Sequence, residues 1–256
     1  MSGITIKTAA DIEKMDVAGR IVEDTLNLLA KSVCPGMHTK ELDEIAAEYI
    51  KSRGATASFL HYNGYPKSIC TSVNEQVVHG IPGKYRIKDG DIVSFDVGAY
   101  IGGFHGDAAR TVLVGDVPED VQKLVRVTKE CFFEGIRFAK PGYRISDIAK
   151  AVQKHAESNG YGVVREMIGH GIGRDMHEDP EVPNYWDNSR FGHGPRLEVG
   201  MTIAIEPMIN LGSRYIYQLK DGWTVVTADG KPSAHYENTI AITDGEPRIL
   251  TLHEES

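Results

Sequence analysis

The sequence predicts an α+β domain made of two similar halves, at about residues 10–115 and 118–250, each a pair of helices followed by strands. Two observations predict the duplication. Pro35-Gly36 recurs as Pro141-Gly142, and each copy precedes apolar residues with the same helical spacing. A third observation is that carboxylates interrupt apolar, strand-like runs in both halves. Chance similarity of two amphipathic helices is the alternative. Without a low-complexity linker, we expect one compact domain over residues 1–256.

Each half begins with two helices, predicted from apolar residues that share one face. The first pair ends near Gly54, and its two stripes are Ile12, Met15, Val22, Leu26 and Leu29, then Leu42, Ile45, Ala46 and Tyr49. The second pair begins near Pro118, a residue suited to a first helical turn, and ends near Gly160. Its stripes are Val121, Leu124, Val125 and Phe132, then Ile148, Ala151, Val152 and His155.

Strands follow the helices, and three of them carry a carboxylate inside an apolar run: Asp96, Glu206 and Glu237. Residues two apart share a face of a strand, so each acid points one way among small or polar neighbours while bulky residues pack the other way. Burying a carboxylate is costly unless it is paired or bound to a metal. These placements therefore predict a shared cation on the open face of a sheet.

A fourth acid, Asp107, follows Asp96 across Gly102-Gly103, a dipeptide that indicates a hairpin between two strand-like runs. Across a hairpin the two acids can lie side by side on one face. They would then repel each other, and a divalent ion between them removes that repulsion. The alternative is that one of the two acids is a turn or cap residue.

Composition indicates an ordinary globular chain of 256 residues, with 41% hydrophobic and 25% charged residues. The net charge of −8 argues against a nucleic-acid surface over the whole molecule. No apolar stretch approaches the roughly 20 residues that span a membrane, and the first residues lack a signal-peptide core. Cys34, Cys70 and Cys131 lack metal-finger spacing and fit a reducing cytosol.

Three of the ten histidines stand out by their context. His170 lies between glycines that let the backbone approach a ligand closely. His177 follows it in Met176-His-Glu, and His79 lies in Val77-Val-His-Gly. A lone histidine is more often a core or surface group than a ligand. A phosphate loop at residues 169–173 is disfavoured because no helical pattern or Lys-Ser/Thr pair follows.

With these motifs in place, the chain resembles the type I methionine aminopeptidases of peptidase family M24, in their short bacterial form, from about Asp11 to Arg248. The matching motifs are Tyr62-Asn-Gly-Tyr-Pro-Lys-Ser-Ile-Cys70, Val-Val-His79-Gly-Ile-Pro, Ser-Phe-Asp96-Val, Phe-His-Gly-Asp107, Gly-His170-Gly-Ile-Gly-Arg, His177-Glu-x-Pro, Ile-Glu206-Pro-Met and Tyr-Glu237-Asn-Thr. The resemblance implies the pita-bread fold, a pseudo-two-fold α+β domain with a curved antiparallel sheet backed by helices. It also implies a cytoplasmic, monomeric hydrolase that removes an N-terminal methionine when the second residue is small.

The resemblance also implies a centre with two divalent metals, cobalt, manganese, iron or zinc, all of which suit such donors. Its ligands would be Asp96, Asp107, His170, Glu206 and Glu237. A water activated by the metals would attack the first peptide bond, and Glu206 would also shuttle the proton. His177 would bind the scissile carbonyl, and His79 would contact the scissile amide.

A methionine pocket is implied at Phe59, Tyr62, Tyr65, Cys70, Met176 and Trp223. Soft and aromatic walls suit a thioether, although ordinary core packing is the alternative, above all for Cys70. Two features depart from the family pattern. Phe59 replaces a smaller residue common in bacterial members, and the connection Tyr185–Pro195 is longer than usual. We expect that connection to be an exposed loop near the active face, with His193 not a ligand.

Three rival functions are also compatible with parts of this pattern. A prolidase or aminopeptidase P would carry an extra N-terminal domain, and a non-catalytic pita-bread protein would lose metal ligands. A metal-stabilised binding module would have no need of His79 and His177. The expected partners are the N-termini of peptides and of nascent chains, including those at the ribosome, with no membrane or nucleic acid.

Overall fold

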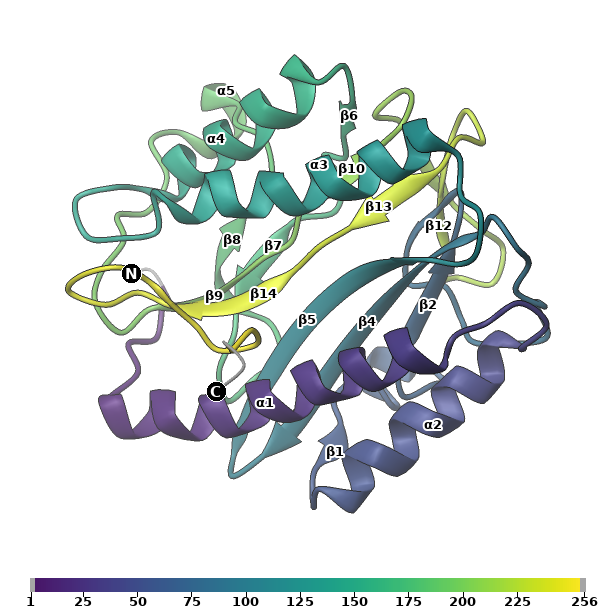
Figure 1. Cartoon of the computed structure of the whole chain (residues 1–256). Helices are drawn as coiled ribbons and strands as arrows, with labels where there is room; N and C mark the ends of the chain where they lie inside the picture. Colours follow the sequence, from purple (N-terminus) through teal and green to yellow (C-terminus); the bar gives the residue numbers. More distant parts are fainter. Residues whose placement is uncertain (1–2, 254–256) are drawn as a thin grey trace.

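The computed structural model describes residues 3–253, in which helices pack against the backs of curved antiparallel sheets (Figure 1). All strand pairings assigned there are antiparallel, and helices and strands are mixed along the chain. This confirms the α+β fold class. None of the helices within residues 3–253 combines the length and the apolar character that a membrane crossing requires.

In the first half, α1 and α2 lie against a sheet whose centre is a long hairpin of β4 and β5 (Figure 1). Strand β4 pairs with β5 along one edge and with β2 and β1 along the other. The elements are α1 Ala9–Ser32, α2 Thr39–Ser52, β1 Thr56–Ala57, the 3₁₀ turn η1 Tyr62–Gly64, β2 Cys70–Val73, β3 Gln76–Val78, β4 Ile92–Ile101 and β5 Phe104–Leu113.

In the second half, α3 and α4 lie together on the other side of the molecule (Figure 1). The largest sheet there has the order β15-β14-β9-β7-β8. The elements are α3 Glu119–Ile136, α4 Ile145–Ser158, β6 Gly162–Val163, β7 Gly169–Gly171, β8 Glu178–Val182, α5 Asn188–Phe191, β9 Thr202–Ile205, β10 Met208–Asn210, β11 Ile216–Gln218, β12 Val225–Thr227, β13 Ser233–His235, β14 Asn238–Ala241 and β15 Arg248–Ile249.

The four predicted helices are present, and the glycines predicted to end them adopt the conformation that this role needs. Gly54 and Gly160 follow α2 and α4 with φ angles of 75° and 84°, in the left-handed region that glycine enters without steric cost. Pro118 is the N-cap of α3. These helix ends depend on local backbone chemistry, which explains why the sequence predicts them well.

The predicted alternation in the acid-bearing strands is also confirmed. Val93, Phe95 and Val97 are fully buried in the cluster that β4 shares with α1 and α2. Met201, Ile203 and Ile205 are buried in a second cluster, which includes side chains of α3 and α4. Bulky residues therefore pack toward the helices, and the opposite face of each strand is left for the acids.

The two halves meet where β5 runs beside the segment between β13 and β14 (Figure 1). The backbone N–H of Glu237 donates to the carbonyl of Ala109 at 3.0 Å, and the Thr239 hydroxyl donates to the carbonyl of Asp107 at 2.8 Å. On the helix side, the Arg110 guanidinium lies 4.3 Å from the Tyr236 ring centroid. The acids of the two halves are thus brought together by direct bonds between their strands.

The expectation that Glu206 and Glu237 lie inside strands was wrong. Glu206 and Glu237 lie in breaks between strands, not inside them, since β9 ends at Ile205 and β13 ends at His235. Pro207, which follows Glu206, has no N–H to donate to a neighbouring strand. The N–H of Glu237 is used to bond β5, so the chain leaves its own ladder there.

The connection Tyr185–Pro195 is mostly exposed, as expected, and it lies against α4. The backbone N–H of Trp186 donates to the Gln153 side chain of α4 at 3.1 Å, and the segment contains α5. Its aromatic rings stack on one another, with Trp186 and Phe191 centroids 5.1 Å apart. These two rings are partly buried against core clusters that include side chains of α3 and α4.

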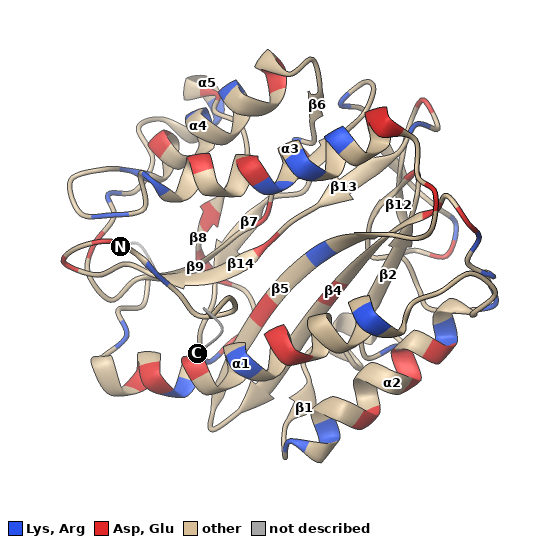
Figure 2. Ribbon diagram, in the orientation of Figure 1, with Lys and Arg blue, Asp and Glu red and all other residues tan. Residues whose placement is uncertain are grey.

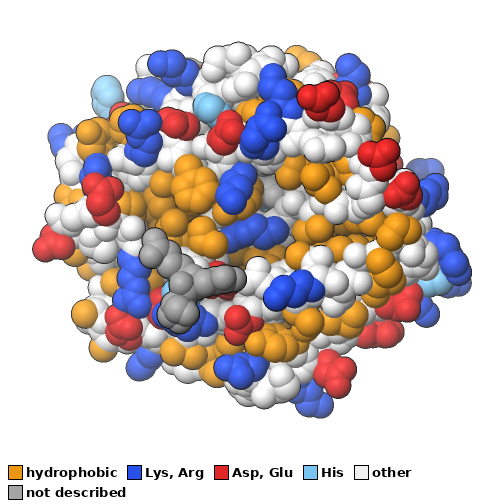
Figure 3. All heavy atoms as spheres, in the orientation of Figure 1, with side chains coloured by type: hydrophobic (Ala, Val, Ile, Leu, Met, Phe, Trp, Pro, Cys, Tyr) orange, Lys and Arg blue, Asp and Glu red, His pale blue; other side chains and the backbone are white. Residues whose placement is uncertain are grey.

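Charged residues are found both on the outer surface of the helices and on the strands. Figure 2 shows acidic residues on β4 and β5, away from the many charges on the outer faces of the helices. In the space-filling view, basic and acidic side chains are interspersed over the face that bears α1 and α3 (Figure 3). The acids on the strands therefore form a separate, internal group.

Candidate metal centre and substrate pocket

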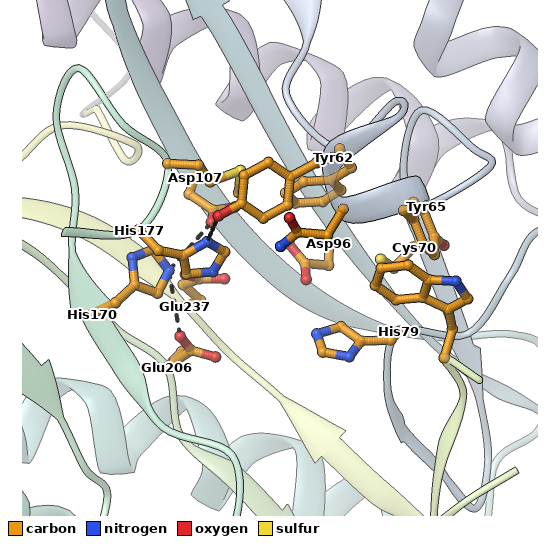
Figure 4. Close-up of a pocket in the computed structure, with 14 residues that line it drawn as sticks. Tyr62, Tyr65, Cys70, His79, Asp96, Asp107, His170, His177, Glu206 and Glu237 are labelled. Carbon is orange, nitrogen blue, oxygen red and sulfur yellow. Dashed lines mark hydrogen bonds and ion pairs between the residues drawn. The ribbon is translucent and has the colours of Figure 1, made fainter.

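One cavity of about 200 Å³ is lined by every residue that the sequence nominated for the site (Figure 4). Asn63 is the one further residue in its wall. The lining residues are Phe59, Tyr62, Asn63, Tyr65, Cys70, His79, Asp96, Asp107, His170, Met176, His177, Glu206, Trp223 and Glu237. His193, in the connection Tyr185–Pro195, is exposed and is not part of this wall.

Asp96 and Asp107 come together because of the register of the β4–β5 hairpin. Asp96 is opposite Ala109, and Gly98 is opposite Asp107, so the two acids are diagonal neighbours on one face. Burial raises the pKa of Asp107 to about 7. Burial, followed by the charge of Asp107, raises the pKa of Asp96 well above its usual value. Two carboxylates in this position cannot both be ionised cheaply without a cation.

His170 offers a nitrogen to the same space. Its Nδ1 is 2.8 Å from the carbonyl oxygen of Gly171, which can only accept, so Nδ1 carries the proton. Its Nε2 lone pair then faces Asp107 Oδ2 and Glu206 Oε1, each 3.7 Å away. A lone pair that faces two carboxylate oxygens is repelled unless a cation lies between them. A histidine fixed by a backbone carbonyl is a common arrangement in metal sites.

Unpartnered oxygens identify the centre of the cluster. Within residues 3–253, Asp96 Oδ1, Asp107 Oδ1 and Glu237 Oε1 are buried and receive no hydrogen bond. Burial, and then the charges of its acidic neighbours, raises the pKa of Glu237 well above its usual value. Atoms of Asp107, His170 and Glu237 also lie within 4.8 Å of one another. Atoms of Glu206, His235 and Glu237 form a second such group, so Glu237 is shared by both. Carboxylate oxygens with imidazole nitrogens at this spacing fit divalent transition metals.

The other two histidines lie around the cluster without joining its centre (Figure 4). The His177 ring centroid is 4.1 Å from that of His170, and its Nδ1 is 2.8 Å from the Tyr62 hydroxyl. His79 lies on the other side of the cavity, beside Trp223, with a left-handed backbone at φ 59°. Burial lowers the pKa of His79 to about 4, so its imidazole is neutral at pH 7.

Apolar walls close the end of the cavity opposite His170. Tyr65 and Trp223 meet edge to face with centroids 5.1 Å apart, and the Tyr65 hydroxyl donates to the carbonyls of Ile69 and Gly80. Phe59, Cys70 and Met176 are buried beside them. Phe59 has room because residue 98 is glycine: a Cβ there would lie 2.9 Å from its ring.

Sequence reasoning missed two residues near the acids. Asn63 lines the mouth of the cavity with a left-handed backbone at φ 49°, and the Asn63-Gly64 pair is a turn signal that could have indicated it. His235 precedes Glu237 by two residues and therefore shares its face. Its Nε2 lies 3.7 Å from Glu206 Oε2 and 3.9 Å from Glu237 Oε2. Burial lowers the pKa of His235 to about 3.

Comparison with known proteins gives close relatives over the whole chain. A methionine aminopeptidase of Clostridium perfringens is 55% identical over 249 residues, which cover 97% of this chain and 99% of the relative. Methionine aminopeptidase 1 of Bacillus subtilis is 52% identical over 248 residues, with the same coverage of 97% and 99%. The crystal structure of methionine aminopeptidase from Rickettsia prowazekii has a TM-score of 0.94 at 42% identity, covering 97% of this chain and 100% of that one.

A more distant likeness concerns the fold alone. Prolidase from Pyrococcus furiosus has a TM-score of 0.78 at 23% identity, and this chain covers only 66% of it. Both groups of structures support the pita-bread fold that the resemblance implied. The model of metallopeptidase family M24 matches residues 13–244. On these matches, the chain belongs to metallopeptidase family M24.

Proposed function

We propose that this chain is a metal-dependent aminopeptidase that removes the N-terminal methionine from peptides and nascent proteins whose second residue is small. The observation that carries the proposal is that one cavity has a carboxylate–imidazole cluster at one end and soft, apolar walls at the other. A first side chain held by the walls would place the first peptide bond beside the acids.

We assign the metal to the four carboxylates that line the cavity and to His170, whose Nε2 faces two of them. Asp96, Asp107, His170, Glu206 and Glu237 would hold two divalent ions, each cobalt, manganese, iron or zinc. The ions would supply a water nucleophile at neutral pH and polarise the first carbonyl. Glu206 would also transfer a proton from the nucleophile to the departing amine.

Two histidines act on the substrate in this proposal. His177 stands at the mouth of the cavity, where the Tyr62 hydroxyl fixes its ring, and would hydrogen-bond the scissile carbonyl as negative charge develops there. His79 enters from the opposite wall and would contact the scissile amide (Figure 4). Together they position the bond from its two sides.

The size of the cavity supports removal of a single residue. About 200 Å³ is below the roughly 300–1,000 Å³ of typical drug-sized ligand sites, which suits a small substrate group. Tyr65 and Trp223 form its closed end, and a long internal segment of a peptide would not fit there. An unbranched thioether matches such soft walls.

The test is turnover of Met-Ala-Ser set beside a Xaa-Pro peptide, with and without added manganese or cobalt. N-acetylated Met-Ala-Ser is the matched control, because an aminopeptidase needs a free amine. We expect metal-dependent release of methionine from the first peptide alone. Preference for the Xaa-Pro peptide would reassign the chain to the prolidase-like hydrolases, and no turnover of any peptide would favour a binding module.

The biological setting is part of the same proposal. We propose a monomer that acts in the cytoplasm on the N-termini of nascent chains, including those at the ribosome. We further propose that residues 1–256 form one catalytic domain whose halves lie at about 10–115 and 118–250. Sedimentation of the purified chain, alone and with ribosomes, tests the monomer and the ribosome contact.

A further inference from the structure

His235 is a buried imidazole beside the acids that has no role in the proposed reaction. It is the last residue of β13 and is 2% exposed. It does not line the cavity described above. Its Nε2 makes no hydrogen bond to any residue in 3–253. Leaving a buried ring nitrogen unpaired costs free energy, so its presence calls for a partner.

The backbone of His235 is held by hydrogen bonds on both sides. Its N–H donates to the Thr111 hydroxyl at 2.9 Å, and that hydroxyl donates to its carbonyl at 2.9 Å. On the other side it pairs with Met208 of β10. These contacts fix the backbone of His235 at the position from which its Nε2 lies 3.7 Å from Glu206 Oε2.

Glu206 lies between two imidazoles, one at each carboxylate oxygen. Oε1 is 3.7 Å from His170 Nε2, on the side of the unpartnered oxygens. Oε2 is 3.7 Å from His235 Nε2, which also lies 3.9 Å from Glu237 Oε2. If Oε1 is the oxygen that binds metal with His170, Oε2 is left for a donor, and His235 is the donor that faces it.

We propose that His235 is a positioning residue that donates its Nε2–H to Oε2 of Glu206 in the metal-loaded protein. This inference rests on the proposed function. The present 3.7 Å is too long for a hydrogen bond, but catalytic hydrogen bonds often tighten only in the working complex, and a small rotation of the Glu206 carboxylate is enough here. The bond would hold one oxygen on the metal and the other ready for the proton.

The consequence of losing the donor follows from this geometry. Oε2 would be left without a partner, and the carboxylate could turn both oxygens toward the metal. Partners of metal-binding groups typically change affinity or activity by about 10–100-fold. Because His235 does not line the cavity, we expect the loss in kcat and not in KM.

The experiment compares His235→Gln with His235→Leu in the full chain saturated with cobalt. Glutamine keeps an N–H at similar reach, whereas leucine keeps only bulk. We expect His235→Leu to lose about 10–100-fold in kcat on Met-Ala-Ser and His235→Gln to recover most of it. His155→Leu is the matched control, because His155 makes a similar imidazole–carboxylate contact, 2.9 Å from Glu130, on the outer helix α4. Circular dichroism checks that each variant folds.

Proton NMR of the cobalt-loaded protein separates positioning from ligation. A ligating imidazole gives a strongly shifted N–H signal, and we expect one such signal, from His170. A second signal that disappears in His235→Leu would make His235 a ligand and overturn the proposal. Equal kcat in all variants, or an equal loss with glutamine and leucine, would overturn it as well. A wild-type chain that binds no cobalt would overturn the proposed function, and this inference with it.

Discussion

Removing the charge of Lys7 should destabilise the fold through the loop that carries Met176 and His177. Lys7 pairs with Glu178, and the two side chains are only 6% and 8% exposed. The other oxygen of Glu178 accepts the backbone N–H of Arg174 at 2.8 Å. The ion pair therefore fastens the segment before α1 to the loop at the mouth of the cavity.

The magnitude follows from leaving one charge buried alone. Breaking a buried pair by removing one partner typically costs about 3–5 kcal/mol. Glu178 keeps its backbone donors in Lys7→Met, so we expect the lower end, about 3 kcal/mol. Glu178→Gln should cost a similar amount, because it leaves the Lys7 ammonium buried without a charged partner. The double variant Lys7→Met/Glu178→Gln should recover much of the loss, since no charge is then buried.

The assay is urea unfolding of the metal-free chain, with kcat on Met-Ala-Ser measured in parallel. Burial favours a raised pKa for Glu178, but hydrogen bonds from Lys7 and Thr5 lower it below its usual value. A lowered carboxylate pKa stabilises the fold above the unfolded pKa and loses this effect as the pH falls, so the variants should differ least in acid. A cost below about 1 kcal/mol, as for exposed pairs, or a double variant no better than the singles, would refute the reasoning.

Three further predictions concern the site. His79→Ala and His177→Ala should each keep their metal but lose about 10²–10³ in kcat, and loss of metal from a folded variant would make that histidine a ligand. A chelator should abolish activity, and metal titration should restore it in two steps of unequal affinity; full activity in thorough chelator would contradict this. Norleucine should replace methionine with a change of only about 1–3 kcal/mol, and Phe59→Ala should raise rates on larger first residues relative to methionine, as measured with Met-, norleucine-, Leu- and Phe-Ala-Ser peptides.

Much of this fold could be predicted from sequence because its signals are local. A helical stripe and a following glycine depend on neighbours a few residues away, so α2 and α4 end where Gly54 and Gly160 predict. The β4–β5 hairpin was equally accessible, since Gly102-Gly103 fixes the turn and the turn fixes the register. The diagonal placement of Asp96 and Asp107 then follows.

What the sequence did not predict depends on contacts between distant segments. Glu237 leaves its strand because its N–H bonds Ala109 of the other half. The segment with Trp186 is fixed by contacts with α4, which no local pattern reveals. His235 was visible as a neighbour of Glu237, but its relation to Glu206 arises only when β13 pairs with β10.

The position of the acids at the junction of two sheets links the chemistry of the site to the stability of the fold. Asp96 and Asp107 come from the β4–β5 hairpin, whereas His170 and Glu237 come from segments around β7 and β14. An ion held by both sets would join the two sheets beside the hydrogen bonds of Thr239 and of the Arg110 guanidinium, which already cross this junction. A ligand that binds the folded state alone adds about 2.7 kcal/mol of stability at a hundred times its Kd. The buried acids, costly while unpaired, would then stabilise the fold once the metal is bound.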